Sequence, residues 1–239
     1  MFSIIVPTLN EEKYLPKLLD SIQRQSLRPS EIIIADADSA DKTREIARKY
    51  NCKIVQGGRI SVGRNNGAKV AKEDILVFID ADVILPSKNF FNNAIGTFIQ
   101  KNADLATGLI LPADKKFKYE IPMRGVNYIH ILFHKLKKQV ICPGTITICT
   151  KKTFNGLNGF DPNIRSCEDR DFVKRAVKMR KRYILLPESI RASTRRFERK
   201  GMKGLLFVGV LGLATILVGT KWIRKIRDKS EKDYWDNLI

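Results

Sequence analysis

The chain has 239 residues, of which 44% are hydrophobic, and it carries a formal net charge of +19. This length is enough for one sizeable core, and the charge indicates anionic partners: nucleic acid, phosphate-bearing ligands or an anionic membrane surface. The four cysteines form no Cys-x-x-Cys pair and only two histidines are present, which excludes the ligand spacing of a zinc site and fits a reducing compartment.

The first 80 residues alternate short apolar runs with stretches of helical periodicity. The apolar runs predict four buried strands, at residues 2–6, 31–35, 52–55 and 75–79. The intervening stretches predict helices at residues 15–22, 43–50 and 61–71, with Asp41 and Ser61 as candidate caps of the last two. Continuous apolar strands that alternate with helices indicate an α/β fold, with a mostly parallel sheet and helices on both faces.

The second half of the chain is less regular. It predicts helices at residues 90–99, 118–138 and 168–179, and strands at residues 104–111, 140–150 and 183–186. The chain begins with a strand-like run rather than the basic region and long apolar stretch of a signal peptide. We therefore expect the folded part to lie in the cytoplasm.

Three polar clusters follow strands of the predicted sheet: Thr8–Glu11, Asp36–Asp41 and Asp80–Asp82. Right-handed crossovers place the loops after parallel strands at one edge of the sheet. Ligands of such sheets bind outside the carboxyl ends of the strands. One cleft can therefore receive all three clusters.

Asp80 and Asp82 are the most specific candidates for chemistry. Two carboxylates at alternating positions after an apolar strand are costly to leave unpaired near a core. Hard cations such as magnesium or manganese take oxygen ligands, which carboxylates often share with substrate phosphates. The pair predicts a divalent metal site that screens a departing diphosphate. Because Asp-x-Asp is also common by chance, the alternative is two solvated loop aspartates.

Six segments carry a longer pattern: Ile4–Glu11, Ile33–Asp41, Gly63–Gly67, Phe78–Asp82, Asn158–Asp161 and Cys167–Asp171. In order and spacing they resemble the family 2 glycosyltransferases with the GT-A fold, such as membrane-associated archaeal and bacterial sugar transferases. The resemblance covers roughly residues 2–186. It implies sugar transfer from a nucleoside-diphosphate sugar by single displacement with inversion, with magnesium or manganese as cofactor.

At matching positions the resemblance implies a nucleotide pocket lined by Pro7, Thr8 and Glu11. Asp36 would hydrogen-bond the base, and a carboxylate there suits uracil or guanine, which both offer N–H donors. We therefore expect a UDP- or GDP-sugar. The family usually reads Asp-Asp-Gly-Ser after this strand, whereas this chain reads Asp36-Ala37-Asp38-Ser39. The alternative for Asp36 is a turn residue in a polar loop.

Arginines at two places match donor-contacting positions of the family. Arg64 begins a segment that touches the donor, and a guanidinium suits phosphate oxygens; the alternative is a solvated helix arginine. Arg195 and Arg196 resemble a terminal basic element that closes over the diphosphate in some relatives. They depart from the Gln-x-x-Arg-Trp pattern of processive synthases, so we expect one sugar to be added per acceptor.

Glu168 and Asp169 match the family's acidic pair at a helix start beside the acceptor site. The resemblance makes Asp169 the general base that deprotonates the attacking hydroxyl, and Glu168 would raise the pKa of its neighbour by like-charge repulsion. Alternatively, these residues only complement a helix N-terminus. A polyprenyl-phosphate acceptor is already an anion, and Asp169 would then orient groups. Phe160, in the acceptor-side loop, packs either on a ligand or in the core.

Residues 205–219 are uncharged and strongly apolar, with basic residues on both sides. A spanning helix needs ~20 such residues, and a single span normally carries positive charge mainly on its cytoplasmic side. We therefore expect a catalytic domain over residues 1–200 and, within residues 201–239, an apolar helix that lies in the cytoplasmic leaflet of an anionic membrane. The protein would be peripheral or monotopic. The alternatives are a core helix and a true span.

These observations predict a metal-dependent glycosyltransferase with a lipid-linked acceptor. A dolichyl- or polyprenyl-phosphate sugar synthase is the close alternative, because it shares the first half. A nucleotidyltransferase would need a glycine-rich, Lys-containing loop where Asn10-Glu11-Glu12 stands. A noncatalytic nucleic-acid-binding protein would fit the charge, but the basic residues cluster beside an apolar stretch and no aromatic stacking array accompanies them. We therefore expect no nucleic-acid partner.

Overall fold

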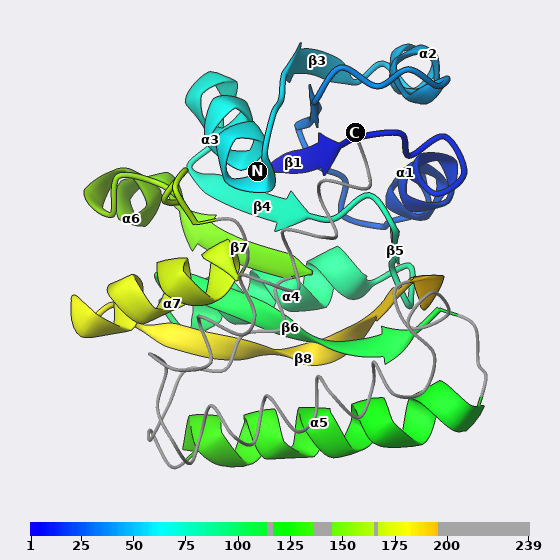
Figure 1. The fold of residues 1–239 in the computed structure, drawn as a ribbon. Coiled ribbons are helices and arrows are strands. Elements are labelled where there is room, and N and C mark those ends of the chain that lie inside the picture. Colours follow the sequence, from blue (N-terminus) through cyan, green and yellow to red (C-terminus); the bar gives the residue numbers. More distant parts are fainter. Residues whose placement is uncertain (114–116, 136–144, 165–166, 196–239) are drawn as a thin grey trace. The chain divides into compact units, whose positions relative to one another are not determined.

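The computed structural model describes residues 1–113, 117–135, 145–164 and 167–195, and Figure 1 shows their strands and helices. The strands are β1 (Ser3–Thr8), β2 (Glu31–Asp36), β3 (Lys53–Gln56), β4 (Ile75–Ile79), β5 (Val83–Ile84), β6 (Leu105–Pro112), β7 (Ile146–Thr150) and β8 (Tyr183–Ala192). The helices are α1 (Leu15–Gln23), α2 (Thr43–Lys49), α3 (Ile60–Val70), α4 (Phe90–Gln100), α5 (Phe117–Lys135), α6 (Lys151–Gly156) and α7 (Glu168–Lys178).

The strands of the described residues form one mixed sheet in the order β3-β2-β1-β4-β7-β6-β8-β5. Strands β3, β2, β1 and β4 are parallel neighbours, as predicted. The second half departs from the parallel pattern, because β7 runs antiparallel to both β4 and β6, and β5 runs antiparallel to β8. The parallel part follows from the alternation of strand and helix, since parallel strands need crossover connections. Strand β7 also follows a strand and a helix, β6 and α5, but it lies between β4 and β6 and runs antiparallel to both, so the alternation alone does not predict its direction.

Alternate side chains of the strands feed two cores on opposite faces of the sheet. Ile4 and Val6 of β1 belong to one core, which also contains residues of α1 and α4. Ile5 belongs to the other core, which contains residues of α3, α6 and α7. All three side chains are fully buried, and each such burial contributes about 1.5–3 kcal/mol. Burial on both faces explains why β1 is a continuous apolar run.

The carboxyl ends of the parallel strands meet at one edge of this scaffold. Thr8 at the end of β1 is in register with Asp36 at the end of β2, which is in register with Gln56 of β3. Strand β4 ends at Ile79, directly before Asp80. The sheet thus brings the three polar clusters to one edge, as predicted.

Short elements and caps differ most from the sequence-based expectations. Strand β5 has two residues and α6 has six, which is too short for a periodic signal. Ser61 lies inside α3, whose N-cap is Arg59. The N-cap of α2 is Lys42 rather than Asp41, although an Asp41 carboxylate oxygen accepts the N–H of Thr43 at 2.9 Å.

The chain divides into two compact units, Met1–Ser193 and Thr194–Ile239. Only Thr194 and Arg195 of the second unit are described, so the predicted apolar helix around residues 205–219 lies outside the described residues. Within the described ranges, no helix combines the length and the apolar character that a membrane crossing requires.

Candidate active site

A buried ion-pair bridge joins three segments at the carboxyl edge of the sheet. Nη2 of Arg64, on α3, donates to Oδ1 of Asp80 at 2.8 Å, and Nη1 donates to Oε1 of Glu168, on α7, at 2.6 Å. The Arg64 side chain is 2% exposed and that of Glu168 is 8% exposed, whereas Asp80 keeps 28% of its side chain exposed. The structure therefore shows Arg64 buried rather than solvated, and its predicted contact with a donor phosphate stays a prediction.

Burial and the neighbouring charges shift the pKa values of Arg64 and Glu168. Burial by itself would lower the pKa of Arg64, but the charges of Glu168, Asp80 and Asp169 outweigh it and the net shift is upward. Burial raises the pKa of Glu168; Arg64 opposes that rise, and the charge of Asp169 adds to it. The predicted like-charge repulsion therefore acts on Glu168. These four residues form one electrostatic cluster.

Helix α7 begins with an acidic first turn at this cluster. Glu168, Asp169 and Asp171 occupy that turn, and Cys167 before it is left-handed with φ 57°. Asp169 is buried. Carboxylates in a first helical turn also interact favourably with the helix dipole. The turn therefore satisfies the dipole and holds acidic groups against Arg64 at the same time.

Asn65, the neighbour of Arg64, ties α3 to the turn that precedes α7. Its Nδ2 donates to the carbonyl oxygen of Phe160 at 2.7 Å, and its Oδ1 accepts the N–H of Phe160 at 2.9 Å. Gly159 has φ 69°, and a Cβ there would lie 2.6 Å from the Asn65 Oδ1, so only glycine fits this approach. Phe160 is fully buried and stacks on Phe172 of α7 at 4.5 Å between ring centroids. It is therefore a core residue rather than one that faces a ligand.

Arg175 of α7 holds the same turn from the other side. Its Nη1 and Nη2 donate to the carbonyl oxygens of Leu157 and Gly159 at 2.6 and 2.8 Å, and its Nε donates to Asp171 at 2.7 Å. The turn is thus fixed between α3 and α7. The sequence carries no signal for the roles of Asn65 or Arg175, because their partners lie in other elements of the fold.

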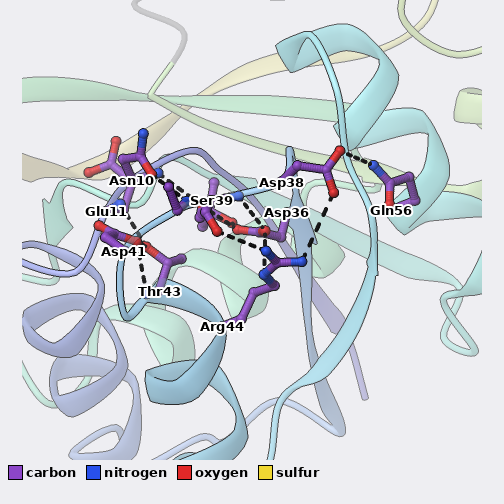
Figure 2. A network of polar contacts seen from close by, with 11 residues as sticks. Asn10, Glu11, Asp36, Asp38, Ser39, Asp41, Thr43, Arg44 and Gln56 are labelled. Carbon is purple, nitrogen blue, oxygen red and sulfur yellow. Dashed lines mark hydrogen bonds and ion pairs between the residues drawn. The ribbon is translucent and has the colours of Figure 1, made fainter. Parts of the chain in front are cut away.

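A second polar network holds the loops after β1 and β2 together (Figure 2). Asp36 is 3% exposed, and its Oδ2 accepts from the hydroxyls of Thr8 at 2.9 Å and Ser39 at 2.6 Å. Its Oδ1 accepts the N–H of Ser39 at 2.9 Å and lies 3.4 Å from Nε of Arg44. Asp36, the last residue of β2, therefore organises the turn that follows the strand, and its predicted contact with the base stays a prediction.

Glu11 and Pro7 lie beside this network. Glu11 is buried; its N–H donates to Oγ1 of Thr43 at 2.8 Å, which links the first loop to α2. A Cβ on Gly63 would lie 3.5 Å from Cβ of Pro7, so α3 rests against the end of β1 one residue before Arg64. The nucleotide-pocket residues predicted from the sequence therefore lie together, next to the helix that carries the ion-pair bridge.

For the remaining predicted residues, Asp82, Arg195 and Arg196, the structure describes fewer contacts. Asp82 lies between β4 and β5, and its carbonyl oxygen accepts the N–H of Ser193 at 3.0 Å. In the part of the chain that the structure describes, no three His, Cys, Asp or Glu side chains form a group that would hold a metal alone. Arg195 belongs to the second compact unit and Arg196 lies outside the described residues, so their donor contacts stay predictions.

Comparison with known proteins identifies the family of this arrangement. The family description "Glycosyl transferase family 2" matches residues 3–155. The chain is 40% identical over 108 residues to 4,4'-diaponeurosporenoate glycosyltransferase of Staphylococcus haemolyticus, covering 41% of this chain and 28% of that protein. It is 28% identical over 191 residues to O-antigen chain rhamnosyltransferase WbaN of Salmonella anatum, covering 74% and 61%. The chain therefore spans less than two thirds of these relatives.

A solved structure shares the fold. The mannosyltransferase PcManGT of Pyrobaculum calidifontis, in complex with GDP-Man and Mn²⁺, superposes with a TM-score of 0.70 at 20% identity, over 95% of this chain and 64% of that one. The α/β fold with a mixed sheet flanked by helices is thus the GT-A-like fold that the sequence predicted.

Replacing Arg64 with methionine tests the buried bridge. Removing one partner of a buried ion pair typically costs about 3–5 kcal/mol, because the carboxylate of Glu168 stays buried without its cation. We expect a loss of that size in the free energy of unfolding measured by urea denaturation. The matched control is Arg124→Met, since Arg124 is 63% exposed and pairs with Glu120 on the surface of α5; such pairs contribute about 0–1 kcal/mol. Equal losses in the two variants would contradict the bridge.

Proposed function

This chain belongs to glycosyltransferase family 2, and from that membership we propose that it transfers one sugar, with inversion, from a nucleoside-diphosphate sugar to a lipid-linked acceptor. The observation that carries the proposal is the meeting of Asp80, Arg64 and the Glu168–Asp169 pair at one sheet edge, beside the loops after β1 and β2. Open α/β sheets bind their ligands at that edge.

The donor nucleotide is assigned to the loops after β1 and β2. Pro7 and Thr8 end β1 beside the organised turn of Asp36, and α3 rests against them. The similar mannosyltransferase of Pyrobaculum calidifontis was solved with GDP-Man, which supports a nucleotide-sugar donor here. A UDP- or GDP-sugar remains the expected class.

We assign a divalent cation, magnesium or manganese, to Asp80 and Asp82. The donor set fits, because hard cations prefer carboxylate oxygens, and Asp80 is partly exposed while Arg64 holds its Oδ1. When bound, the ion supplies charge neutralisation for the departing diphosphate. Among the described residues no group of three such side chains forms, and carboxylates that bind a hard cation would commonly share it with substrate phosphates and water. The Mn²⁺ in the Pyrobaculum calidifontis structure supports this assignment.

Asp169 is assigned as the general base for a hydroxyl acceptor. The support is its place in the acidic first turn of α7, directly after the Glu168 that pairs with Arg64, because a positioned carboxylate can accept the proton of an attacking hydroxyl. If the acceptor is a polyprenyl phosphate, as in the polyprenyl-phosphate sugar synthases, the nucleophile needs no base and Asp169 orients it instead.

A panel of nucleotide sugars tests the donor class. We expect a UDP- or GDP-sugar to raise the Tm of the full chain only with Mg²⁺ or Mn²⁺, because a ligand at 100 times its Kd stabilises the native state by about 2.7 kcal/mol. Asp82→Asn should remove the metal-dependent part, whereas Asp74→Asn, at an exposed position before β4, should keep it. Equal shifts in EDTA would contradict the metal assignment, and no shift with any nucleotide sugar would contradict the donor class.

Asp169→Asn tests the general base. For a hydroxyl acceptor we expect kcat at saturating donor to fall by about 10²–10⁴-fold, while the Kd of the donor stays within about twofold. Asp171→Asn is the control, since Asp171 shares the acidic first turn and would lose a similar dipole interaction. Wild-type turnover by Asp169→Asn on a hydroxyl acceptor would remove Asp169 from the base role.

We further propose that the protein works at the cytoplasmic face of the membrane, as a peripheral or monotopic enzyme. The support is the basic and apolar sequence around residues 205–219. The full chain should co-sediment with vesicles that contain phosphatidylglycerol, more weakly with pure phosphatidylcholine, and less at 0.5 M salt, since juxtamembrane basic residues contribute roughly 1 kcal/mol each near anionic lipid. Recovery in the supernatant under all three conditions would overturn this localisation.

A further inference from the structure

The carboxylate of Asp36 is already occupied by the protein. Its two oxygens face two hydroxyls, one backbone amide and one guanidinium, contributed by Thr8, Ser39 and Arg44. An ionised carboxylate offers about four lone-pair sites. A nucleobase that bound to Asp36 would have to displace one of these partners and leave a buried polar group unpaired. The base-reading acceptor must therefore be sought elsewhere in the same loop.

Asp38, two residues further on, carries a second carboxylate, which is exposed rather than buried. Its side chain is 73% exposed. Its Oδ2 accepts from Nε2 of Gln56 at 2.9 Å, and its Oδ1 lies 4.0 Å from Nη1 of Arg44. Figure 2 shows Asp38 between Gln56 and Arg44, beside the Asp36 network. The contact with Gln56 orients this carboxylate and leaves it acceptor capacity toward solvent.

The backbone explains how the loop accommodates this residue. Asp38 has φ 59°, in the left-handed region that aspartate tolerates better than most residues. The resembling family usually has glycine at this position and an aspartate one residue earlier, where this chain has Ala37. The loop therefore keeps two acidic residues, with the second moved by one position.

The carboxyl ends of β1, β2 and β3 lie close together around this loop. The N–H of Ala37 donates to the carbonyl oxygen of Thr8 at 2.9 Å. A Cβ on Gly57 would lie 2.6 Å from the carbonyl oxygen of Ala35 and 2.7 Å from the nitrogen of Ala37, so glycine lets the end of β3 lie directly against the loop. Asp38 thus stands at the strand-end edge where a nucleotide binds in this class of sheet.

Resting on the proposed function, we propose that Asp38 is the residue that selects the donor base and that Asp36 is a buried positioning residue that shapes the loop. The Asp38 carboxylate accepts the ring N–H of uracil or guanine. Cytosine and adenine present a ring acceptor at the equivalent place, which a carboxylate repels. An asparagine at position 38 would offer both a donor and an acceptor, and would lose this discrimination.

The test is isothermal titration of the full chain with UDP, GDP and CDP in the presence of Mn²⁺. We expect wild type to bind UDP or GDP at least tenfold more tightly than CDP. Asp38→Asn should bring this ratio to within about threefold at an unchanged Tm, because the side chain is exposed. Asp74→Asn should keep the wild-type ratio. Asp36→Asn should lower the Tm and keep the ratio in the fraction that stays folded, since a positioning role does not read the base.

Two results overturn the inference alone: a wild-type chain that binds all three nucleotides equally, or an Asp38→Asn variant that discriminates as wild type does. Loss of the ratio in Asp36→Asn, with retention in Asp38→Asn, would return the base contact to Asp36. A wild-type chain that binds none of the nucleotides overturns the proposed donor class, and the inference falls with it.

Discussion

A guanidinium buried among carboxylates is the interaction on which the rest of this structure depends. Arginine does not lose its proton in proteins, and an unpaired buried charge is very costly. The fold that buries Arg64 must therefore bring acidic groups to it, and it does so with Asp80 from the end of β4 and Glu168 from the start of α7. The placement of α7 beside the end of β4 and the acidic character of the site both go with satisfying this one cation.

The same division between buried and exposed acids recurs in the site. Glu168 and Asp36 are buried and held by protein donors, so they fix the positions of α7 and of the β2 loop. Asp80 and Asp38 are the more exposed members, with 28% and 73% of their side chains exposed, and both are the residues that we assign to ligands. When buried partners already hold the ligand-binding side chains in place, ligand binding costs little side-chain conformational entropy. Within these two pairs, Glu168 with Asp80 and Asp36 with Asp38, the buried carboxylate positions and the more exposed one is assigned to a ligand; Asp169 is assigned to the acceptor although it is buried.

Much of this organisation follows from local sequence. The apolar runs of β1, β2 and β4 predict a buried parallel sheet because both faces are covered, and Asp80 is placed by its position directly after β4. The partners of Arg64 and Asn65 do not follow, since Glu168 is 104 residues from Arg64 and Phe160 is 95 residues from Asn65. The burial of Phe160 in the core is visible only in the packed fold. Strand β5 has two residues and is too short to predict from sequence. The antiparallel β7 likewise depends on its tertiary neighbours.

A double-mutant cycle between Arg64 and Glu168 measures the central interaction most directly. The free energy of unfolding would be determined by urea denaturation for wild type, Arg64→Met, Glu168→Gln and the double variant. Residues in one buried ion-pair network show interaction energies of about 0.5–3 kcal/mol, and the bridge predicts a value of about 2 kcal/mol or more, because Arg64→Met leaves the buried Glu168 carboxylate without its cation and Glu168→Gln leaves Arg64 with Asp80 but without its more buried partner. Additivity within about 0.5 kcal/mol would show that the two side chains do not depend on each other, and would contradict the bridge as the organising interaction.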